Sequence, residues 1–466
     1  MQPPSHASPM SGVSPVSAVI ERFYARTDGD PLAGAFQKKA AVHAGMQMPN
    51  LDVTKFQEVF RALMARPRSG KSAAYISIPF CKTRCLYCGF FNRFHRDDLE
   101  AAYVDALIGE LKQSSSDPAV TSGPVHALYL GGGTPNALSA ENLRRVLDAA
   151  TCYLPLANDC EITVEGRIHG FGQDKIDACL EGGANRFSIG VQSFDTNVRR
   201  SMARIDDRES VLQALERLMA TDQAAVVIDL VYGFPGQTME IWEEDVRTAA
   251  SLALDGADLY QLNVLPHSEL AKRMAQGAIE PAADMTRQAR MFAQGLDVME
   301  ANRWRRLSVS HWGRTTRERN LYNQLVKNKA HILAFGCGAG GSLHGHGYFV
   351  ERDLERYLDS IREGRKPLAM VTARPDTDRE VTGAITGGFD VAALNLQQLA
   401  ALLGTELLER CLPLFEQWGK AGLLEQSGHW VVLTRAGQFW NVTMAQYLLE
   451  YLASLREPTM PAAMGQ

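Results

Sequence analysis

Short apolar runs alternate with longer amphipathic stretches between residues 73 and 300. Six of these runs, from AYISIPF at 74–80 to ADLYQLNVLP at 257–266, are rich in β-branched and aromatic residues and predict buried strands. A segment with helical spacing of its apolar positions follows each run. The alternation is typical of an α/β protein built from βαβ units around a parallel sheet. Six units predict a partial (β/α)6 barrel, although a doubly wound sheet has the same alternation, and in both folds the functional groups gather at the carboxyl ends of the strands.

The pattern changes on both sides of this core. Residues 1–15 combine Pro, Ser and Gly, which predicts disorder, and helical patterns follow them. Beyond residue 300 the alternation of apolar runs and amphipathic stretches stops, and the chain becomes irregular and rich in Gly and Arg. The last part predicts short helices, a hairpin that turns at Ser427-Gly428, and a final helix. We therefore expect an N-terminal extension, disordered and then helical (1–70), the (β/α)6 core (71–300), a Gly- and Arg-rich extension of the core (301–370), and a C-terminal winged-helix-like α+β domain (371–466).

Composition narrows the class of protein. Of the 466 residues, 45% are hydrophobic, which supplies a sizeable core and excludes a disordered chain. Lys and Arg number 48 against 53 Asp and Glu, and the net charge of −5 gives no sign of a nucleic-acid partner. Apolar runs stay well short of the ~20 residues of a membrane-spanning helix, and the first residues show no signal-peptide pattern. We expect a cytoplasmic protein.

Cys81, Cys85 and Cys88 directly follow the first predicted strand. This CxxxCxxC spacing puts three thiols on one tight loop, and clustered thiols in a reducing compartment more often bind metal than form disulfides. A 4Fe–4S cluster held entirely by protein needs a fourth cysteine, but the next residue is Gly89. We therefore expect a cluster with three Cys ligands and one open iron. A zinc site completed by His95 is the alternative.

The position of this motif, after the first strand of a βα series, resembles the radical SAM superfamily. The resemblance implies that S-adenosylmethionine binds the open iron, and that an electron from the reduced cluster cleaves it to methionine and a 5′-deoxyadenosyl radical. It also implies a low-potential electron donor, a flavodoxin or a ferredoxin. The segment LGGGTP at 130–135 ends the second predicted strand, and in this superfamily such a segment contacts the methionine amino group.

Further motifs resemble one subfamily, the oxygen-independent coproporphyrinogen III oxidase-like proteins. The matching segments are YISIPFC (75–81), GGGTP (131–135), GVQSF (190–194), DLVYGFPG (229–236) and LTRAG (433–437). The resemblance implies one or two bound molecules of S-adenosylmethionine. The residues that it places around the cofactor are Tyr75, Gly132, Gly133, Thr134, Glu165, Gln192, Arg204 and Asp229.

Several departures from the subfamily pattern indicate the branch. Gly89 stands where the coproporphyrinogen oxidases carry a fourth cysteine, and residues 164–171 lack the usual Pro-containing turn. The haem-chaperone branch carries His-Asn-x-x-Tyr-Trp where this chain has RNLYNQ at 319–324. With Cys-Gly-Phe at 88–90, the chain is most similar to the anaerobic haem-utilisation branch, the HutW/ChuW-type radical SAM methyltransferases. That resemblance implies methylation of haem, opening of the porphyrin ring, and release of iron and a linear tetrapyrrole. The alternatives are oxidative decarboxylation of coproporphyrinogen III and a haem chaperone without turnover.

Two features suit an anionic tetrapyrrole. Residues 301–330 carry a single acid, Glu318, among many bases, and Arg pairs well with carboxylates such as propionates. A solvated surface or a docking face for an acidic donor are the other interpretations of this cluster. His311 falls where related porphyrin enzymes carry a His, so we expect it to be catalytic, ahead of His169, His344 and His346. The basic residues are Arg303, Arg305, Arg306, Arg314, Arg317, Arg319, Lys327 and Lys329.

Overall fold

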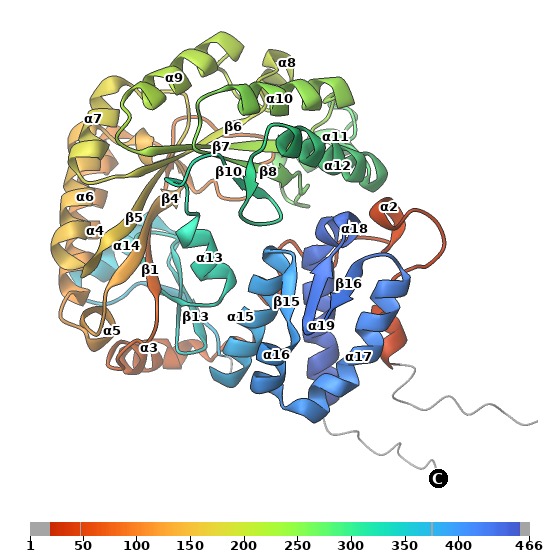
Figure 1. Cartoon of the computed structure of the whole chain (residues 1–466). Coiled ribbons are helices and arrows are strands. Elements are labelled where there is room, and N and C mark those ends of the chain that lie inside the picture. The colour runs from red at the N-terminus through yellow and green to blue at the C-terminus, as the bar shows by residue number, and fades with distance from the viewer. Residues whose placement is uncertain (1–18, 47, 374–375, 457–466) are drawn as a thin grey trace, which may run out of the picture.

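The computed structural model describes residues 19–46, 48–373 and 376–456. The disorder predicted for residues 1–15 lies outside this part of the chain. Figure 1 shows a curved sheet wrapped by helices and, beside it, a smaller unit formed by the C-terminal part of the chain. The predicted α/β class is confirmed. Among the helices of the described residues, none is long and apolar enough to cross a membrane.

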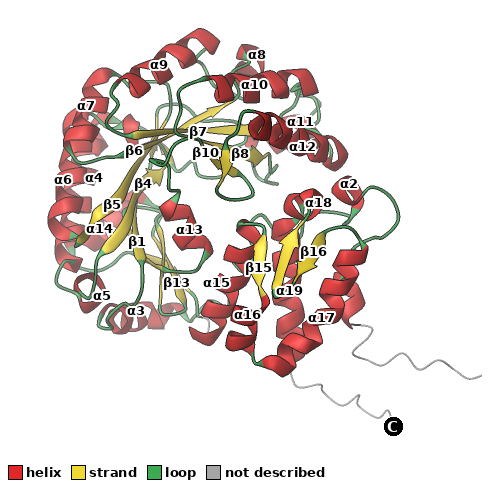
Figure 2. Ribbon diagram, viewed as in Figure 1, coloured by secondary structure: helices red, strands yellow, loops and turns green. Residues whose placement is uncertain are grey.

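Six parallel strands form the centre of the sheet (Figure 2) and follow one another in chain order. Each strand leads into a helix on the outside of the curve, so the six predicted strand–helix units are confirmed. Because the order of the strands does not reverse, the winding is that of a barrel and not of a doubly wound sheet. The strands are β1 (Ser72–Ile78), β4 (Val125–Gly132), β5 (Leu156–Gly166), β6 (Arg186–Gln192), β7 (Ala225–Tyr232) and β8 (Gly256–Gln261). The main helices after them are α4 (Asp97–Ser114), α6 (Ala140–Tyr153), α7 (Gln173–Glu181), α9 (Arg208–Ala220), α10 (Met239–Ser251) and α12 (Met285–Ala301).

The sheet continues beyond these six strands at both edges but does not close. β11 (His331–Phe335) pairs in parallel with β1, and β10 (His311–Gly313) pairs antiparallel with β8. Across the described residues the ladder runs from β14 (Leu368–Val371) to β9 (Arg305–Arg306), and these two edges do not pair. The barrel is therefore partial, as predicted. The segment 301–370, which we expected to be irregular, instead contains short strands, and strands of 2 to 5 residues are too short to show a periodic pattern. It also contains β12 (Gly340–Leu343) and β13 (His346–Val350).

One end of the barrel is filled by the chain itself. Helix α13 (Leu321–Lys327) packs against β1 and β4 on the inside of the sheet. Leu325 contacts the cluster formed by Ala73 and Ala127 near the starts of those strands. The amino end of the barrel is thus occupied, and the carboxyl ends of the strands remain for a binding site.

The C-terminal unit consists of helices around a three-stranded antiparallel sheet. Its hairpin joins β16 (Leu424–Ser427) to β17 (Trp430–Leu433) and turns through Gly428, whose φ of 59° lies in the left-handed region. The predicted hairpin is confirmed. The other elements are α15 (Asp376–Asp390), β15 (Ala393–Asn395), α16 (Leu396–Leu403), α17 (Thr405–Lys420), α18 (Arg435–Phe439) and α19 (Asn441–Arg456).

The N-terminal extension connects the two bodies. Trp418 of α17 donates its indole N–H to the carbonyl of Phe23 at 3.0 Å. The short helix α2 (Pro31–Gly34) contacts both α12 of the barrel and α18 of the C-terminal unit. Further along, α3 (Phe56–Met64) packs on the edge of the sheet, where Phe60 meets the ring of Tyr348. The extension therefore bridges the barrel and the C-terminal unit.

Candidate functional site

The three expected metal ligands lie on one loop at the carboxyl end of β1, which we call the cysteine loop (residues 81–88). Cys81 ends the short strand β2 (Phe80–Cys81), which pairs with β3 (Arg93–Phe94) and holds the loop closed. Cys81 and Cys85 are buried, and Cys88 is half-buried. Burial raises the pKa of Cys81 to about 11 and also raises that of Cys88, and charge on the neighbouring thiols adds to both shifts. The loop therefore brings the three thiols together.

Cys85 differs from the other two thiols because two guanidinium groups face its sulfur. Arg167 donates from Nη2 at 3.2 Å and Arg204 donates from Nη1 at 3.4 Å. Burial alone would raise the pKa of Cys85, but the charges of Arg204 and Arg167 outweigh it and hold the pKa below its ordinary value. The thiolate, which is the form that binds metal, is therefore favoured at this position.

Arg167 is a residue of the site that sequence analysis missed. It follows the last residue of β5, and its Nη1 donates to the carbonyl of Thr83 in the cysteine loop at 2.7 Å. Its backbone N–H donates to Asn136 Oδ1 at 3.0 Å, and Asn136 Nδ2 donates back to the carbonyl of Arg167 at 3.0 Å. A lone basic residue after a strand is no signal by itself. The one sequence feature that pointed to Arg167 was that residues 164–171 lack the Pro-containing turn usual in the subfamily.

The GGGTP segment approaches the end of β1 so closely that side chains are excluded. Gly133 donates its N–H to a carbonyl at the end of β1 at 2.7 Å. Gly132 has a φ of 107°, and a Cβ there would lie 2.7 Å from Ser77 Oγ. Thr134 donates its hydroxyl to Cys81 Sγ at 3.4 Å. These contacts fix the cysteine loop against the end of β4, so the glycines have a packing role independent of any ligand.

Two carboxyl groups with raised pKa lie near each other at β5 and β7. Burial raises the pKa of Glu165 to about 8, Asp229 adds to this shift, and a hydrogen bond from the Gly132 N–H opposes it. Burial raises the pKa of Asp229 to about 7, with Asp258 adding to the shift and Arg186 opposing it. Both side chains are partly accessible. A cationic ligand would favour their charged forms, so the pair suits a positively charged molecule.

The remaining expected cofactor contacts are Tyr75 of β1, Gln192 at the end of β6, and Arg204, whose charge acts on Asp229. The ring of Tyr75 stacks with that of Tyr129 at 6.1 Å between centroids. Gln192 ends β6 with a φ of 74°, an uncommon conformation for a residue other than glycine, and the pairing of β6 with β7 shifts register there. Arg204 Nε is buried and has no hydrogen-bond partner among the described residues. An orphaned guanidinium donor of this kind suits a ligand carboxylate.

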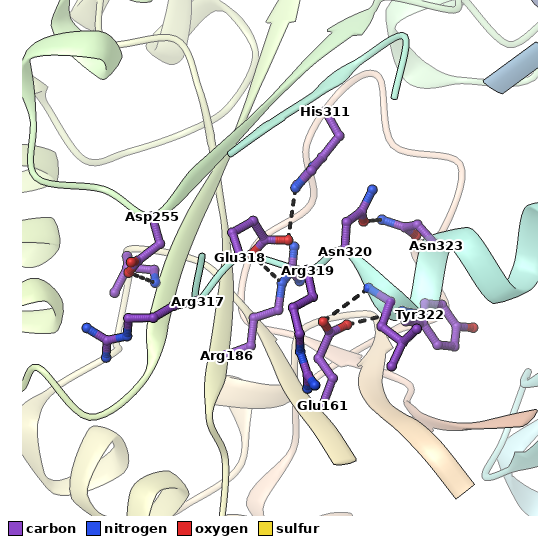
Figure 3. Close-up of polar contacts among 12 residues, drawn as sticks. Glu161, Arg186, Asp255, His311, Arg317, Glu318, Arg319, Asn320, Tyr322 and Asn323 are labelled. Atoms are coloured by element: carbon purple, nitrogen blue, oxygen red, sulfur yellow. Dashed lines mark hydrogen bonds and ion pairs between the residues drawn. The ribbon is translucent and has the colours of Figure 1, made fainter. Parts of the chain in front are cut away.

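His311 lies in a buried ionic network in the barrel wall (Figure 3). Asp258 Oδ1 is 2.7 Å from its Nδ1, and Glu318 Oε1 is 2.9 Å from its Nε2. Arg186 Nε donates to the other oxygen of Glu318 at 2.9 Å. Burial alone would lower the pKa of His311, but the two carboxylates outweigh it and raise the pKa to about 9. The charge of His311 acts on Asp229, which connects the network to the acids of the site.

The expectation of an anion site among the basic residues of 301–330 is not supported. Most of these side chains bind groups of the chain itself, and Figure 3 shows Arg317 and Arg319 pointing away from each other. Their acidic partners lie far away in sequence, so the local window could not show them. The contacts are Arg305 to the Glu318 carbonyl, Arg306 to the Ser308 and Val309 carbonyls, Arg314 to the Leu252 carbonyl, Arg317 to Asp222, Arg319 to Asp159, and Lys327 to Asp390. Glu318, the single acid, instead lies at the centre of the buried network.

The zinc alternative is not supported either. His95 Nε2 lies 2.6 Å from Glu100 Oε2, which also caps the start of α6 through Ser139. The imidazole is therefore engaged by a carboxylate on α4. Its backbone N–H donates to the carbonyl of Cys81, so the residue braces the loop through its main chain.

Comparisons with known proteins agree with this arrangement. The model of the radical SAM superfamily matches residues 75–249. The chain is 42% identical to anaerobilin synthase of Escherichia coli O157:H7, over 85% of this chain and 87% of the relative. It is 26% identical to the haem chaperone HemW of Bacillus subtilis (strain 168), over 78% and 96% of the two chains. Among solved structures, coproporphyrinogen III oxidase (HemN) of Escherichia coli matches with a TM-score of 0.73 at 21% identity, over 87% of this chain and 97% of that one.

The chain belongs to the radical SAM superfamily, and within it to the relatives of anaerobilin synthase. Enzymes of this superfamily use a 4Fe–4S cluster and S-adenosylmethionine. The residues present fit both groups. Three thiols without a fourth suit a cluster with one open iron, and the orphaned donor of Arg204 and the acids Glu165 and Asp229 suit a ligand with both a carboxylate and positive charge.

Arg167→Gln is expected to make the cluster harder to reduce. The guanidinium donates to Cys85 Sγ, and positive charge and hydrogen bonds at a ligating sulfur stabilise the reduced cluster. At a fixed potential the ratio of reduced to oxidised cluster should fall about tenfold, which corresponds to a fall of about 59 mV in the one-electron midpoint potential. A potentiometric titration followed by electron paramagnetic resonance measures this ratio. Arg167→Lys keeps the charge, so its midpoint potential should lie between those of Arg167→Gln and the native protein. An unchanged midpoint potential in Arg167→Gln would contradict the assignment.

The network around His311 predicts a loss of stability at alkaline pH. Because the folded-state pKa is raised from 6.5 to about 9, the stabilisation is complete below about pH 6.5 and disappears as the pH rises through about 9. The shift corresponds to about 3 kcal/mol. Denaturant unfolding of the apoprotein at several pH values should show a steeper alkaline loss in the native protein than in His311→Gln. His169→Gln, at a half-exposed histidine, is the control. Parallel pH profiles for native protein and His311→Gln would refute the network's role.

Proposed function

We propose that the protein is a radical SAM methyltransferase that degrades haem under anaerobic conditions. It methylates haem, opens the porphyrin ring, and releases iron with a linear tetrapyrrole. The observation that carries the proposal is the 42% identity to anaerobilin synthase across most of both chains. A cytoplasmic location fits the use of haem that is already inside the cell.

Cys81, Cys85 and Cys88 are the proposed ligands of the cluster. When bound, the cluster and S-adenosylmethionine supply one-electron cleavage of the sulfonium and a carbon-centred radical. The chain's own contribution is to hold the three thiols on one loop, which the pairing of β2 with β3 closes, and to bury Cys81 and Cys85. The two guanidiniums at Cys85 supply positive charge where electron density is added.

The cofactor contacts are proposed residue by residue. Arg204 Nε, the orphaned donor, binds the carboxylate of S-adenosylmethionine. Glu165 and Asp229 accept hydrogen bonds from its amino and hydroxyl groups and gain charge as they do so. The other proposed contacts are Tyr75, Gly132, Gly133, Thr134 and Gln192. His311 is proposed as the residue that holds a proton near Asp229, and its place in the network makes it a positioning residue.

A haem chaperone is the second candidate function. The relationship to HemW of Bacillus subtilis, over 78% of this chain, favours it. The chaperone would hold haem and form no deoxyadenosine in response to it. Decarboxylation of coproporphyrinogen III is the third candidate, and the fold match to HemN supports only the architecture.

An anaerobic reaction separates these functions. Reconstituted protein is mixed with haem, a reducing system and S-adenosylmethionine carrying a deuterated methyl group, and the products are analysed by mass spectrometry. We expect deoxyadenosine and an iron-free linear tetrapyrrole that carries the deuterated methyl.

The controls are two cysteine variants. Cys85→Ala should lose both the cluster absorbance and deoxyadenosine formation, whereas Cys152→Ala, at an exposed cysteine, should retain both. Unchanged haem with carbon dioxide released from coproporphyrinogen III would replace the proposal with the decarboxylase. Bound, unmodified haem without deoxyadenosine would replace it with the chaperone.

A further inference from the structure

The chain that contains and follows the cysteine loop has an unusual composition. Residues 82–96, which we call the basic aromatic segment, contain four cationic residues and three phenylalanines but no acid. The protein as a whole has a net charge of −5, so this positive charge is a local feature. The cations are Lys82, Arg84, Arg93 and Arg96, and the phenylalanines are Phe90, Phe91 and Phe94.

Two of these phenylalanines are displayed to solvent. Phe90 is 74% exposed and Phe94 is 56% exposed, more than any other aromatic side chain that the structure describes. The ring of Phe91 holds the group together, because it meets the ring of Phe94 at 4.9 Å and lies under the guanidinium of Arg84 at 5.0 Å. Lys82 and Arg84 are themselves exposed. Clustered exposed aromatic residues with flanking arginine are typical of protein interaction sites.

The segment also forms the outer wall of the proposed cluster site. The backbone N–H of Phe90 donates to Cys88 Sγ at 3.3 Å. Cys88 is half-buried, whereas Cys81 and Cys85 are buried. Cys88 is therefore the most exposed of the three thiols, and Phe90 lies directly beside it.

We infer that the basic aromatic segment is the docking surface for an acidic electron-carrier protein. The inference rests on the proposed function, since it requires a cluster on the three cysteines. In the docked complex the reduced carrier loses one electron and the cluster gains one, with no transfer of a group. Lys82 and Arg84 attract the acidic carrier, and Phe90 and Phe94 bury against it beside Cys88.

Charge and position favour this occupant over others. A second copy of this chain is acidic overall, but its assembly would cover the path of electrons to Cys88. Haem is bound by enclosing side chains, whereas Phe90 and Phe94 are largely exposed here. An acidic carrier accounts for both the positive charge and the exposed aromatic rings of this surface. The opposite charges speed the encounter, and the rings provide a contact beside Cys88, where the electron enters.

The test measures reduction of the cluster, without haem turnover, in the full-length reconstituted protein. A purified acidic flavodoxin in its hydroquinone form is mixed with the protein in a stopped-flow instrument, and reduced methyl viologen, a small cation, serves as the second reductant. Lys82→Glu/Arg84→Glu and Phe90→Ser/Phe94→Ser should each lower the flavodoxin rate constant at least about tenfold at low salt. The viologen rate should not fall. Added salt should slow the native protein towards the charge-reversed variant.

The control changes matched residues at the other end of the barrel. Val53 is 71% exposed and Lys55 is exposed, and they lie just before α3, which packs on α5 (Pro118–Thr121) ahead of β4. Val53→Ser/Lys55→Glu should leave both rates unchanged. If the double variants lose iron, Phe94→Ser alone replaces Phe90→Ser/Phe94→Ser in the test, because Phe94 is farther along the chain from Cys88.

Three results would overturn the inference. The first is equal flavodoxin rates in the native protein and in iron-replete variants, and the second is a native protein that flavodoxin does not reduce at all. The third is a monomer–dimer change in the variants that accounts for the loss. Failure of the native protein to assemble any cluster would instead overturn the proposed function, and the docking surface with it.

Discussion

The close contact between the ends of β1 and β4 is the constraint on which the site depends. Gly133 donates to the end of β1 at 2.7 Å, and no side chain fits at this contact. The contact fixes where the cysteine loop leaves the sheet, and Thr134 then reaches Cys81. From there the loop continues so that Cys81 and Cys85 are buried and Cys88 is half-buried. A displacement of either strand end would move all three sulfurs together.

A buried ionic network connects the strands in another part of the barrel wall. Arg186 of β6, Asp258 of β8 and His311 of β10 are connected through ion pairs that also include Glu318. All four side chains are buried, so breaking one partner leaves a charge uncompensated. The same charges act on the pKa of Asp229, which burial raises, Asp258 raises further, and Arg186 and His311 lower. The stability of this part of the barrel wall and the electrostatics of the site are thus coupled.

The fold was largely predictable because its strands and helices are long and periodic. Cysteine spacing and strand ends also placed the cysteine loop correctly in the fold. Contacts between distant segments were not predictable: Arg167 reaches the loop from the end of β5, and Glu318 pairs with Arg186 across the barrel wall. The basic residues of 301–330 suggested an anion site because their acidic partners, such as Asp159 and Asp222, are remote in sequence. The local sequence pattern predicts secondary structure and the spacing of ligands, but it does not predict which distant charged residue a side chain will pair with.

The central claim is that three thiols hold a cluster and leave one iron open. Mössbauer spectroscopy of protein reconstituted with ⁵⁷Fe, with and without S-adenosylmethionine, tests it most directly. The account predicts a cubane of four irons in which one iron alone changes its isomer shift when the cofactor is added. Four irons that do not respond to the cofactor, or a site that takes up zinc in place of iron, would contradict it.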